Sequence, residues 1–164
     1  DPIAYNEFVF EFLTQHDNTY LTELHELFMQ KVIRPQMRPD GFQAIQRHKE
    51  AGHALVGITA TSDFITAPIF REFGISEIIA TNAEVVDGKY TGKVINTPCY
   101  QKGKLTRLDQ WLAGRDVTES WAYSDSINDR FLLEYADHAI AVNPDDRLEA
   151  LAKDQAWEIQ DWSI

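Results

Sequence analysis

The sequence contains little cysteine, no long apolar run and no excess of basic residues. Cys99 is the single cysteine among 164 residues, so an internal disulfide is impossible and a reducing, cytoplasmic setting is expected. No stretch approaches the roughly 18 apolar residues of a membrane-spanning helix. Lys and Arg total 15 against 26 Asp and Glu, and the resulting net charge of −11 argues against nucleic acid or an anionic membrane as a partner.

The composition provides enough apolar material for a folded core. Hydrophobic residues make up 44% of the chain and aromatic residues 12%, which excludes an intrinsically disordered protein. A length of 164 residues corresponds to about one domain. The acidic balance leaves a small anionic substrate open, because a local cation or a bound metal can reverse the field within a pocket.

The first 34 residues have helical spacing. Apolar side chains recur at three- and four-residue steps over residues 5–13 and again over residues 21–32, which predicts two amphipathic helices. Asp17 lies between them and is expected to cap the second helix. Two helices are too few to bury their own apolar stripes, so this part requires a partner surface.

After Pro39 the pattern becomes an alternation of strands and helices. Strands are expected at residues 54–58, 78–80, 120–123, 139–142 and 157–159, and helices at 42–51, 68–73, 104–112, 129–135 and 147–152. A β-hairpin is expected at residues 84–95, around Asp87-Gly88. The sequence thus predicts an α/β fold with a parallel sheet, whose functional residues lie at the carboxyl ends of the strands.

Two of these strand and helix ends carry groups suited to an anion. Thr59, Ala60 and Thr61 follow the first predicted strand, where a hydroxyl and backbone N–H groups can bind an anion; the alternative is an N-cap for the next helix. Lys102 and Lys104 begin a predicted helix, where a lysine opposes the helix dipole unless an anion is near. The alternative there is a solvated lysine.

A third end carries two carboxylates. Asp125 and Asp129 lie four residues apart where a strand turns into a helix. Clustered hard oxygen ligands suit magnesium, which takes one or two carboxylates and retains several waters. The alternative is an Asp that caps the helix, together with an Asp in the first turn, where a negative charge interacts favourably with the helix dipole.

Together these segments resemble the haloacid dehalogenase (HAD) superfamily of hydrolases, and most closely its phosphoserine-phosphatase-like subfamily IB. The resemblance extends over nearly the whole chain and rests on residues 58–69, 92–104, 123–129 and 141–145. The acidic segment with its Asn143-Pro144-Asp145 follow-up is the most specific part. The resemblance implies a HAD-type Rossmann-like core over residues 35–164 and the end of a helical cap domain over residues 1–34.

The resemblance also implies roles for individual residues. Thr59 matches the hydroxyl that hydrogen-bonds the phosphoryl group, with Ala60 and Thr61 beside it. Lys104 matches the lysine that neutralises the nucleophile and the phosphate, and Lys102 remains an alternative. The acidic turn supplies a magnesium ligand, the carboxylate beside it and two residues lining the same loop: Asp125, Asp129, Ser126 and Asn128. The implied activity is Mg²⁺-dependent hydrolysis of a small phosphorylated metabolite.

The family's first motif, Asp-x-Asp-x-Thr, is missing. It follows the first, central strand, and its first Asp is the nucleophile, but the chain contains no Asp-x-Asp. Residues 15–19 imitate the tail of the motif, yet Gln15 stands at the nucleophile position and a helical pattern precedes it. The expectation is therefore a chain that starts inside the cap, is inactive alone, and leaves two sheet edges unpaired, a state that a homodimer would relieve.

Two other functions remain open. A HAD-like domain without chemistry would be a binding or regulatory protein. A receiver-type phosphoacceptor domain also uses Asp, Thr and Lys on a parallel sheet, but the cap-like helices and the motif order disfavour it. A thiol nucleophile at Cys99 is disfavoured because no histidine is near it in the sequence.

Overall fold

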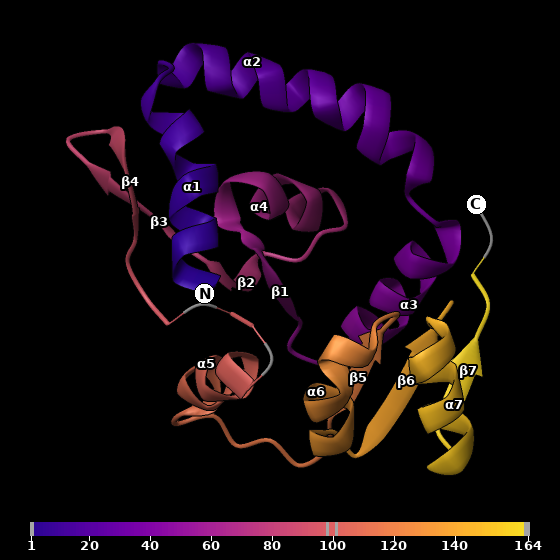
Figure 1. Ribbon diagram of the computed structural model, residues 1–164. Coiled ribbons are helices and arrows are strands. Elements are labelled where there is room, and N and C mark those ends of the chain that lie inside the picture. Colours follow the sequence, from indigo (N-terminus) through magenta and orange to yellow (C-terminus); the bar gives the residue numbers. More distant parts are fainter. Residues whose placement is uncertain (1, 98, 101, 163–164) are drawn as a thin grey trace.

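The computed structural model describes residues 2–97, 99–100 and 102–162, and shows an α/β fold (Figure 1). The helices are α1 (Pro2–Thr14), α2 (Asn18–Phe28), α3 (Pro39–Glu50), α4 (Asp63–Glu72), α5 (Lys102–Leu112), α6 (Arg130–Tyr135) and α7 (Asp146–Asp154). The strands are β1 (Val56–Ser62), β2 (Glu77–Thr81), β3 (Ala83–Val86), β4 (Lys89–Val94), β5 (Trp121–Ser124), β6 (His138–Val142) and β7 (Glu158–Gln160). A π-helical turn η1 (Met29–Ile33) and the 3-10 turns η2 (Arg34–Gln36) and η3 (Ile127–Asp129) complete the chain.

The strands form two parallel sheets and one hairpin. β1 pairs with β2, and β5, β6 and β7 pair in that order. β3 and β4 form the expected antiparallel hairpin. Within the described part of the chain the two parallel sheets do not pair with each other.

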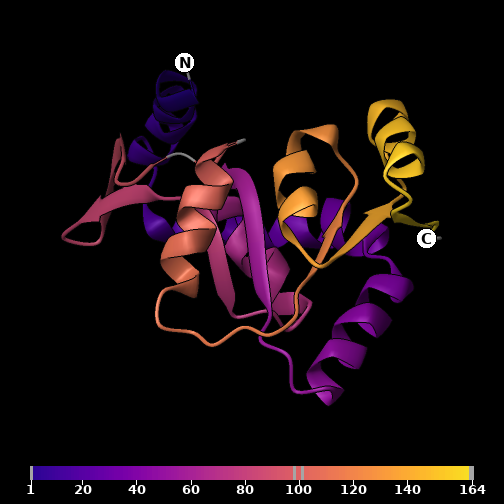
Figure 2. The ribbon, with the colours of Figure 1, turned by 90° about the horizontal axis from the view of Figure 1, so that it is seen from below.

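Two helices link the part of the fold around β1 and β2 to the part around β5, β6 and β7. α5 packs against β1 and β2 and also against α6, which follows β5 (Figure 2). α3 places the ring of Phe42 4.5 Å from that of Phe73, beyond the end of α4. In the last turn of α3, His48 Nε2 lies 2.8 Å from the hydroxyl of Tyr123 on β5. These helices hold the two sheets together without strand pairing.

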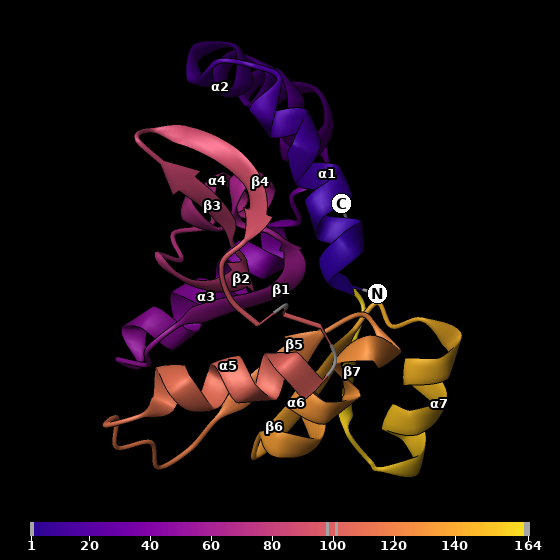
Figure 3. The same ribbon diagram turned by 60° about the vertical axis from the view of Figure 1, so that its left-hand side comes forward.

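The core consists of two apolar clusters. Small and aliphatic side chains of β6, α6 and α7 form one: Leu133, Ala139, Ala141, Leu148 and Ala152. The second joins α1 and α2 to the hairpin: Phe10, Leu13, Leu21 and Ala83. The predicted partner surface of the first two helices is therefore the hairpin, which lies alongside α1 (Figure 3).

Polar contacts fasten the same helices to the α/β part. Asp17 caps α2 as expected, accepting a hydrogen bond from the backbone N–H of Tyr20 at 2.8 Å. Asn18 Nδ2 donates to the carbonyl oxygen of Gly88 at 2.6 Å, and His25 Nε2 lies 2.9 Å from the carbonyl oxygen of Ile65. None of the helices in the described ranges is long and apolar enough to cross a membrane.

The structure corrects several predicted boundaries, of which the end of β1 and the start of α4 affect the candidate site. β1 continues to Ser62, so residues 59–61 lie within the strand and not after it. Ser62 caps α4, accepting from the backbone N–H of Ile65 at 3.4 Å, and α4 begins five residues before the expected start at Pro68. The capping serine outweighs the helix-breaking tendency of Pro68, which is accommodated inside the helix.

Candidate functional site

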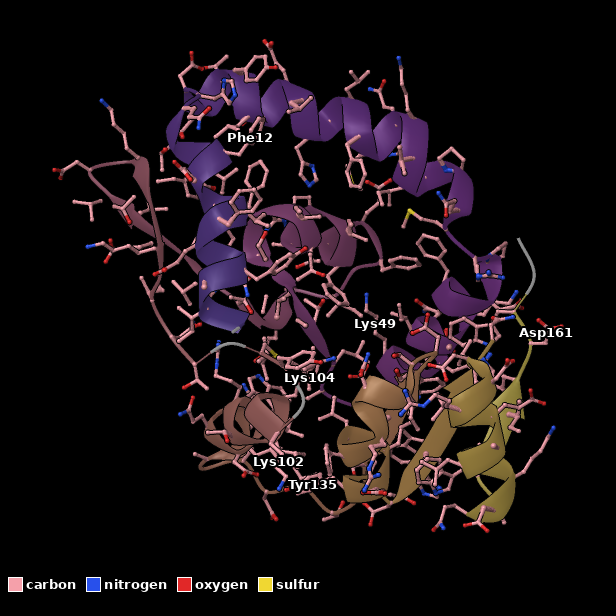
Figure 4. All side chains as sticks on the ribbon, in the orientation of Figure 1. Phe12, Lys49, Lys102, Lys104, Tyr135 and Asp161 are labelled. Atoms are coloured by element: carbon pink, nitrogen blue, oxygen red, sulfur yellow. The ribbon has the colours of Figure 1, made fainter. Side chains whose placement is uncertain are left out.

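The centre of the candidate site is a buried lysine. Lys104 lies in the first turn of α5 and is 6% exposed (Figure 4). Its ammonium group forms an ion pair with Oδ1 of Asp129, and Oδ2 of Asp129 accepts a hydrogen bond from the hydroxyl of Ser124 at 2.8 Å. A buried charge must be paired to be tolerated, and this pairing connects α5 to the turn after β5.

The two candidate lysines differ in environment. Lys102 is exposed, and its ammonium group lies 5.8 Å from the centre of the Phe131 ring. Lys104 alone of the pair is buried beside the acidic turn. The geometry therefore selects Lys104 as the lysine that can meet a bound anion there.

The acidic turn is held by hydrogen bonds between residues that are close in the sequence. Ser126 caps η3 by accepting from the backbone N–H of Asn128 at 3.3 Å. Asp129 is at the N-cap position of α6, but its side chain makes no capping hydrogen bond and pairs with Lys104 instead. Asp125 and Asn128 are exposed. The turn thus presents one carboxylate to solvent and directs the other toward Lys104.

Asp145 stabilises this turn from the neighbouring strand end, a role that the sequence analysis did not assign. Its carboxylate accepts from the backbone N–H groups of Ile127 at 2.9 Å and Leu148 at 2.8 Å. These hydrogen bonds lower the pKa of Asp145 below its usual value. Its own N–H donates to the carbonyl oxygen of Asp125 at 2.8 Å. An Asp directly before a helical pattern is the signal that identifies such a cap.

Cys99 lies close to both Thr59 and Lys104. Thr59 is half-buried, and its hydroxyl oxygen accepts from the backbone N–H of Thr61 at 3.2 Å. The thiol of the fully buried Cys99 donates to the carbonyl oxygen of Ile79 at 3.6 Å, and the backbone of Thr59 lies close enough to act on the pKa of that thiol. Burial raises the pKa of that thiol, while the nearby charges of Lys104 and Arg107 lower it. The end of β1 and the buried lysine thus share one neighbourhood, and the raised pKa of the thiol opposes a role as nucleophile.

Asp125 and Asp129 fit part of a magnesium site. Carboxylate oxygens are the ligands that this hard cation prefers, and one or two of them suffice when water and substrate phosphate complete the shell. Asp129 is already engaged by Lys104 and Ser124, which leaves Asp125 as the free ligand. No cluster of three or more His, Cys, Asp or Glu side chains able to hold a metal occurs within residues 2–97, 99–100 and 102–162.

Known proteins resemble this chain closely. The curated Histidinol-phosphatase of Neisseria meningitidis serogroup C (strain 8013) is 40% identical over 153 residues, covering 90% of this chain and 69% of the relative. Phosphoserine phosphatase SerB1 of Mycobacterium tuberculosis (strain ATCC 25618 / H37Rv) is 34% identical over 146 residues, covering 88% and 47%. A crystal structure of a protein with unknown function from Bordetella pertussis Tohama I has a TM-score of 0.89 and 40% identity, covering 95% of this chain and 72% of that one.

The chain spans 69% and 47% of the lengths of these two curated relatives. A family model described as haloacid dehalogenase-like hydrolase matches residues 1–134, which is most of the chain. The expected resemblance is confirmed: the chain belongs to the haloacid dehalogenase-like hydrolases, a family of enzymes.

Proposed function

We propose that the protein carrying this chain is a magnesium-dependent phosphatase of small phosphomonoesters. The observation that supports it most is the buried Lys104, paired with Asp129 beside the exposed Asp125. A cation held in a sheltered position stabilises charge on a transferring phosphoryl group better than one in water. Phosphatases among the relatives, named for histidinol and for phosphoserine, support a phosphate ester as the substrate.

Each residue has a part in this proposal. Lys104 binds a phosphoryl oxygen and is oriented by Asp129. The Thr59 hydroxyl provides a neutral donor near the end of β1, with Ala60 and Thr61 beside it, while Asn128 lines the acidic turn. Asp125 holds Mg²⁺, which when bound offsets the charge of the phosphoryl oxygens.

The reaction also needs a nucleophile. A carboxylate oxygen attacks phosphorus, the bond from phosphorus to the leaving oxygen breaks, and the alcohol departs after taking a proton from a general acid. Water then attacks the aspartyl-phosphate, releasing inorganic phosphate and restoring the carboxylate. The 164 residues contain no Asp-x-Asp, so a segment outside them supplies this group and the 164 residues alone have no turnover. The unpaired state of the two parallel sheets leaves a place for such a segment's strand.

The test is magnesium-dependent phosphate release by the longer protein that carries this chain. Histidinol phosphate and phosphoserine are the first substrates, with and without a chelator. Replacing Asp125 by Asn should reduce turnover at least about 100-fold and raise the magnesium needed, since it removes an anionic ligand.

The control is Asp109→Asn, which alters an exposed carboxylate on α5 by the same chemistry and should leave turnover within about twofold. Equal activity of Asp125→Asn and wild type would refute the assigned metal ligand. No phosphate release from any small phosphomonoester, by a protein that is folded, would instead favour the competing binding or regulatory function.

A further inference from the structure

Arg107 makes an unusual set of hydrogen bonds near Lys104. It lies three residues after Lys104 on α5, about one helical turn further along. Its Nη1 donates to the backbone carbonyl oxygens of Ala80 at 3.1 Å and Thr97 at 3.2 Å, and its Nη2 donates to Oδ1 of Asn82 at 3.2 Å. One guanidinium thus joins α5 to β2 and to the segments that follow β2 and β4.

The hydrogen bonds continue from Asn82 to the end of β1. Asn82 Nδ2 donates to Oδ2 of Asp63 at 2.7 Å, and Oδ1 of Asp63 accepts from the backbone N–H groups of Phe64 at 2.9 Å and Ala83 at 3.3 Å. Asp63 directly follows β1. A continuous series of polar contacts therefore runs from the end of β1 to the middle of α5.

On its other side α5 reaches β5. Lys104 pairs with Asp129, which is held by Ser124 at the end of β5. Because β1 and β5 do not pair in the described structure, no strand hydrogen bonds fix the distance between their carboxyl ends. α5 spans that distance, with Arg107 bound to one side and Lys104 to the other.

We propose that Arg107 is a positioning residue that holds Lys104 at the acidic turn by fixing α5 against the end of β2. That the acidic turn binds phosphate rests on the proposed function. The positioning role of Arg107 rests only on the contacts that Arg107 makes. The planar guanidinium suits the task because its several donors reach three acceptors at once, which a lysine ammonium on a flexible stem does not reproduce. Displacements of about 1 Å at a catalytic group reduce rates by about 100-fold, so such fixing has functional weight.

Arg115 offers a matched control next to the same helix. It lies just beyond the C-terminal end of α5 and also joins it to β2, through Glu77 at 2.6 Å. Its side chain is 39% exposed, and it stacks on Trp111 at 4.0 Å. Exposed ion pairs of this kind contribute little to stability. Comparing substitutions of the two arginines therefore shows whether an effect is specific to the contacts of Arg107.

The first test measures how fast each lysine reacts with a small amine-directed acylating reagent, resolved by mass spectrometry. In the wild type Lys104 should react much more slowly than the exposed Lys102. Arg107→Gln should raise the rate at Lys104 about tenfold through local opening, with the exposed Lys153 unchanged. Arg115→Gln should leave the rate at Lys104 within about twofold.

Conservative variants keep the test decisive if Arg107→Gln folds poorly by circular dichroism. Arg107→Lys retains the positive charge but not the three hydrogen bonds, so it should expose Lys104 nearly as much as Arg107→Gln does. Asn82→Ala removes one acceptor and should give a smaller increase at Lys104. An unchanged rate at Lys104 in folded Arg107 variants, or an equal increase in Arg115→Gln, would overturn the proposal.

A second test uses turnover. If Arg107 acts through Lys104, Arg107→Gln should lower kcat/KM when introduced into the wild type. The same change should have little further effect on kcat/KM when introduced into the Lys104→Met variant. Additive losses would contradict the positioning role even in an active phosphatase. The labelling result needs no turnover, so absence of phosphatase activity would refute the proposed function and leave the positioning of Lys104 standing.

Discussion

At the scale of single residues, the direction in which a side chain points decides which of two neighbouring lysines can act. Residues two apart on a helix differ by about 200° around its axis, so Lys102 and Lys104 face opposite ways. The sequence favoured Lys104 but left Lys102 as an alternative, because the choice depends on where α5 begins and on what packs against it. Arg107 was missed for a similar reason, because its partner Ala80 is distant in the sequence. Ser124 was missed although its partner Asp129 is close in the sequence, because no local pattern shows which way its hydroxyl points.

A histidine pair next to β5 gives a prediction about pH. His48 Nδ1 lies 2.8 Å from His53 Nδ1, and His48 Nε2 lies 2.8 Å from the Tyr123 hydroxyl. Burial, followed by the charges of His53 and Arg47, lowers the pKa of His48. The neutral form is therefore favoured in the folded state. The stability it contributes is complete above the pKa of an unfolded histidine and is lost as the pH falls toward the lowered folded value.

The measurement is chemical denaturation from pH 7.5 to pH 5, followed by circular dichroism. His48→Gln should show a smaller loss of unfolding free energy over that range than the wild type, because Gln does not titrate. His16→Gln, in the turn between α1 and α2, should keep the wild-type slope. Parallel slopes for wild type and His48→Gln would show that His48 does not contribute to the pH dependence.

At the scale of elements, periodicity predicted nearly every helix and strand, and the exception is informative. The predicted end of β1 at residue 58 assumed that polar residues leave the strand. Threonine suits strands, however, and the hydroxyl of Thr81 on β2 donates to the carbonyl oxygen of Ala60 at 3.1 Å. This pairing extends β1 through the candidate phosphate-binding residues. Element boundaries depend on such contacts, which no local pattern contains.

The packing of α1 on the hairpin leads to a stability prediction. Phe10 is fully buried in the cluster with Leu21 and Ala83, whereas Phe8 on the same helix is 74% exposed. Phe10→Ala should lower the unfolding free energy by about 3–5 kcal/mol, through lost burial and the cavity left behind. Phe8→Ala makes the same chemical change and should cost less than about 0.5 kcal/mol. Urea denaturation of both variants measures the difference, and equal losses would contradict this packing of α1.

At the scale of the whole molecule, an acidic protein places two cationic side chains at its candidate site. The net charge is −11, yet Lys104 and Arg107 both lie near the buried Cys99, where their charges partly offset the rise in the thiol pKa that burial causes. Average composition does not reveal such local cations, which an anionic substrate could meet. The sequence did predict the parallel α/β arrangement and the family, because strand–helix alternation and the acidic segment are local features. The missing motif led us to expect two unpaired sheet edges, and in the described residues β1–β2 and β5–β7 form separate sheets.

The central claim is that the acidic turn with Lys104 is a phosphatase site. Its most direct test is kcat/KM for phosphate release by the longer protein in saturating Mg²⁺, compared between Lys104→Met and Lys102→Met, with folding checked by circular dichroism. Lys104→Met should lose at least about 100-fold, the usual effect of removing one electrostatic contact to the transition state, while Lys102→Met should stay within about threefold. Equal kcat/KM values for the two folded variants would contradict the claim.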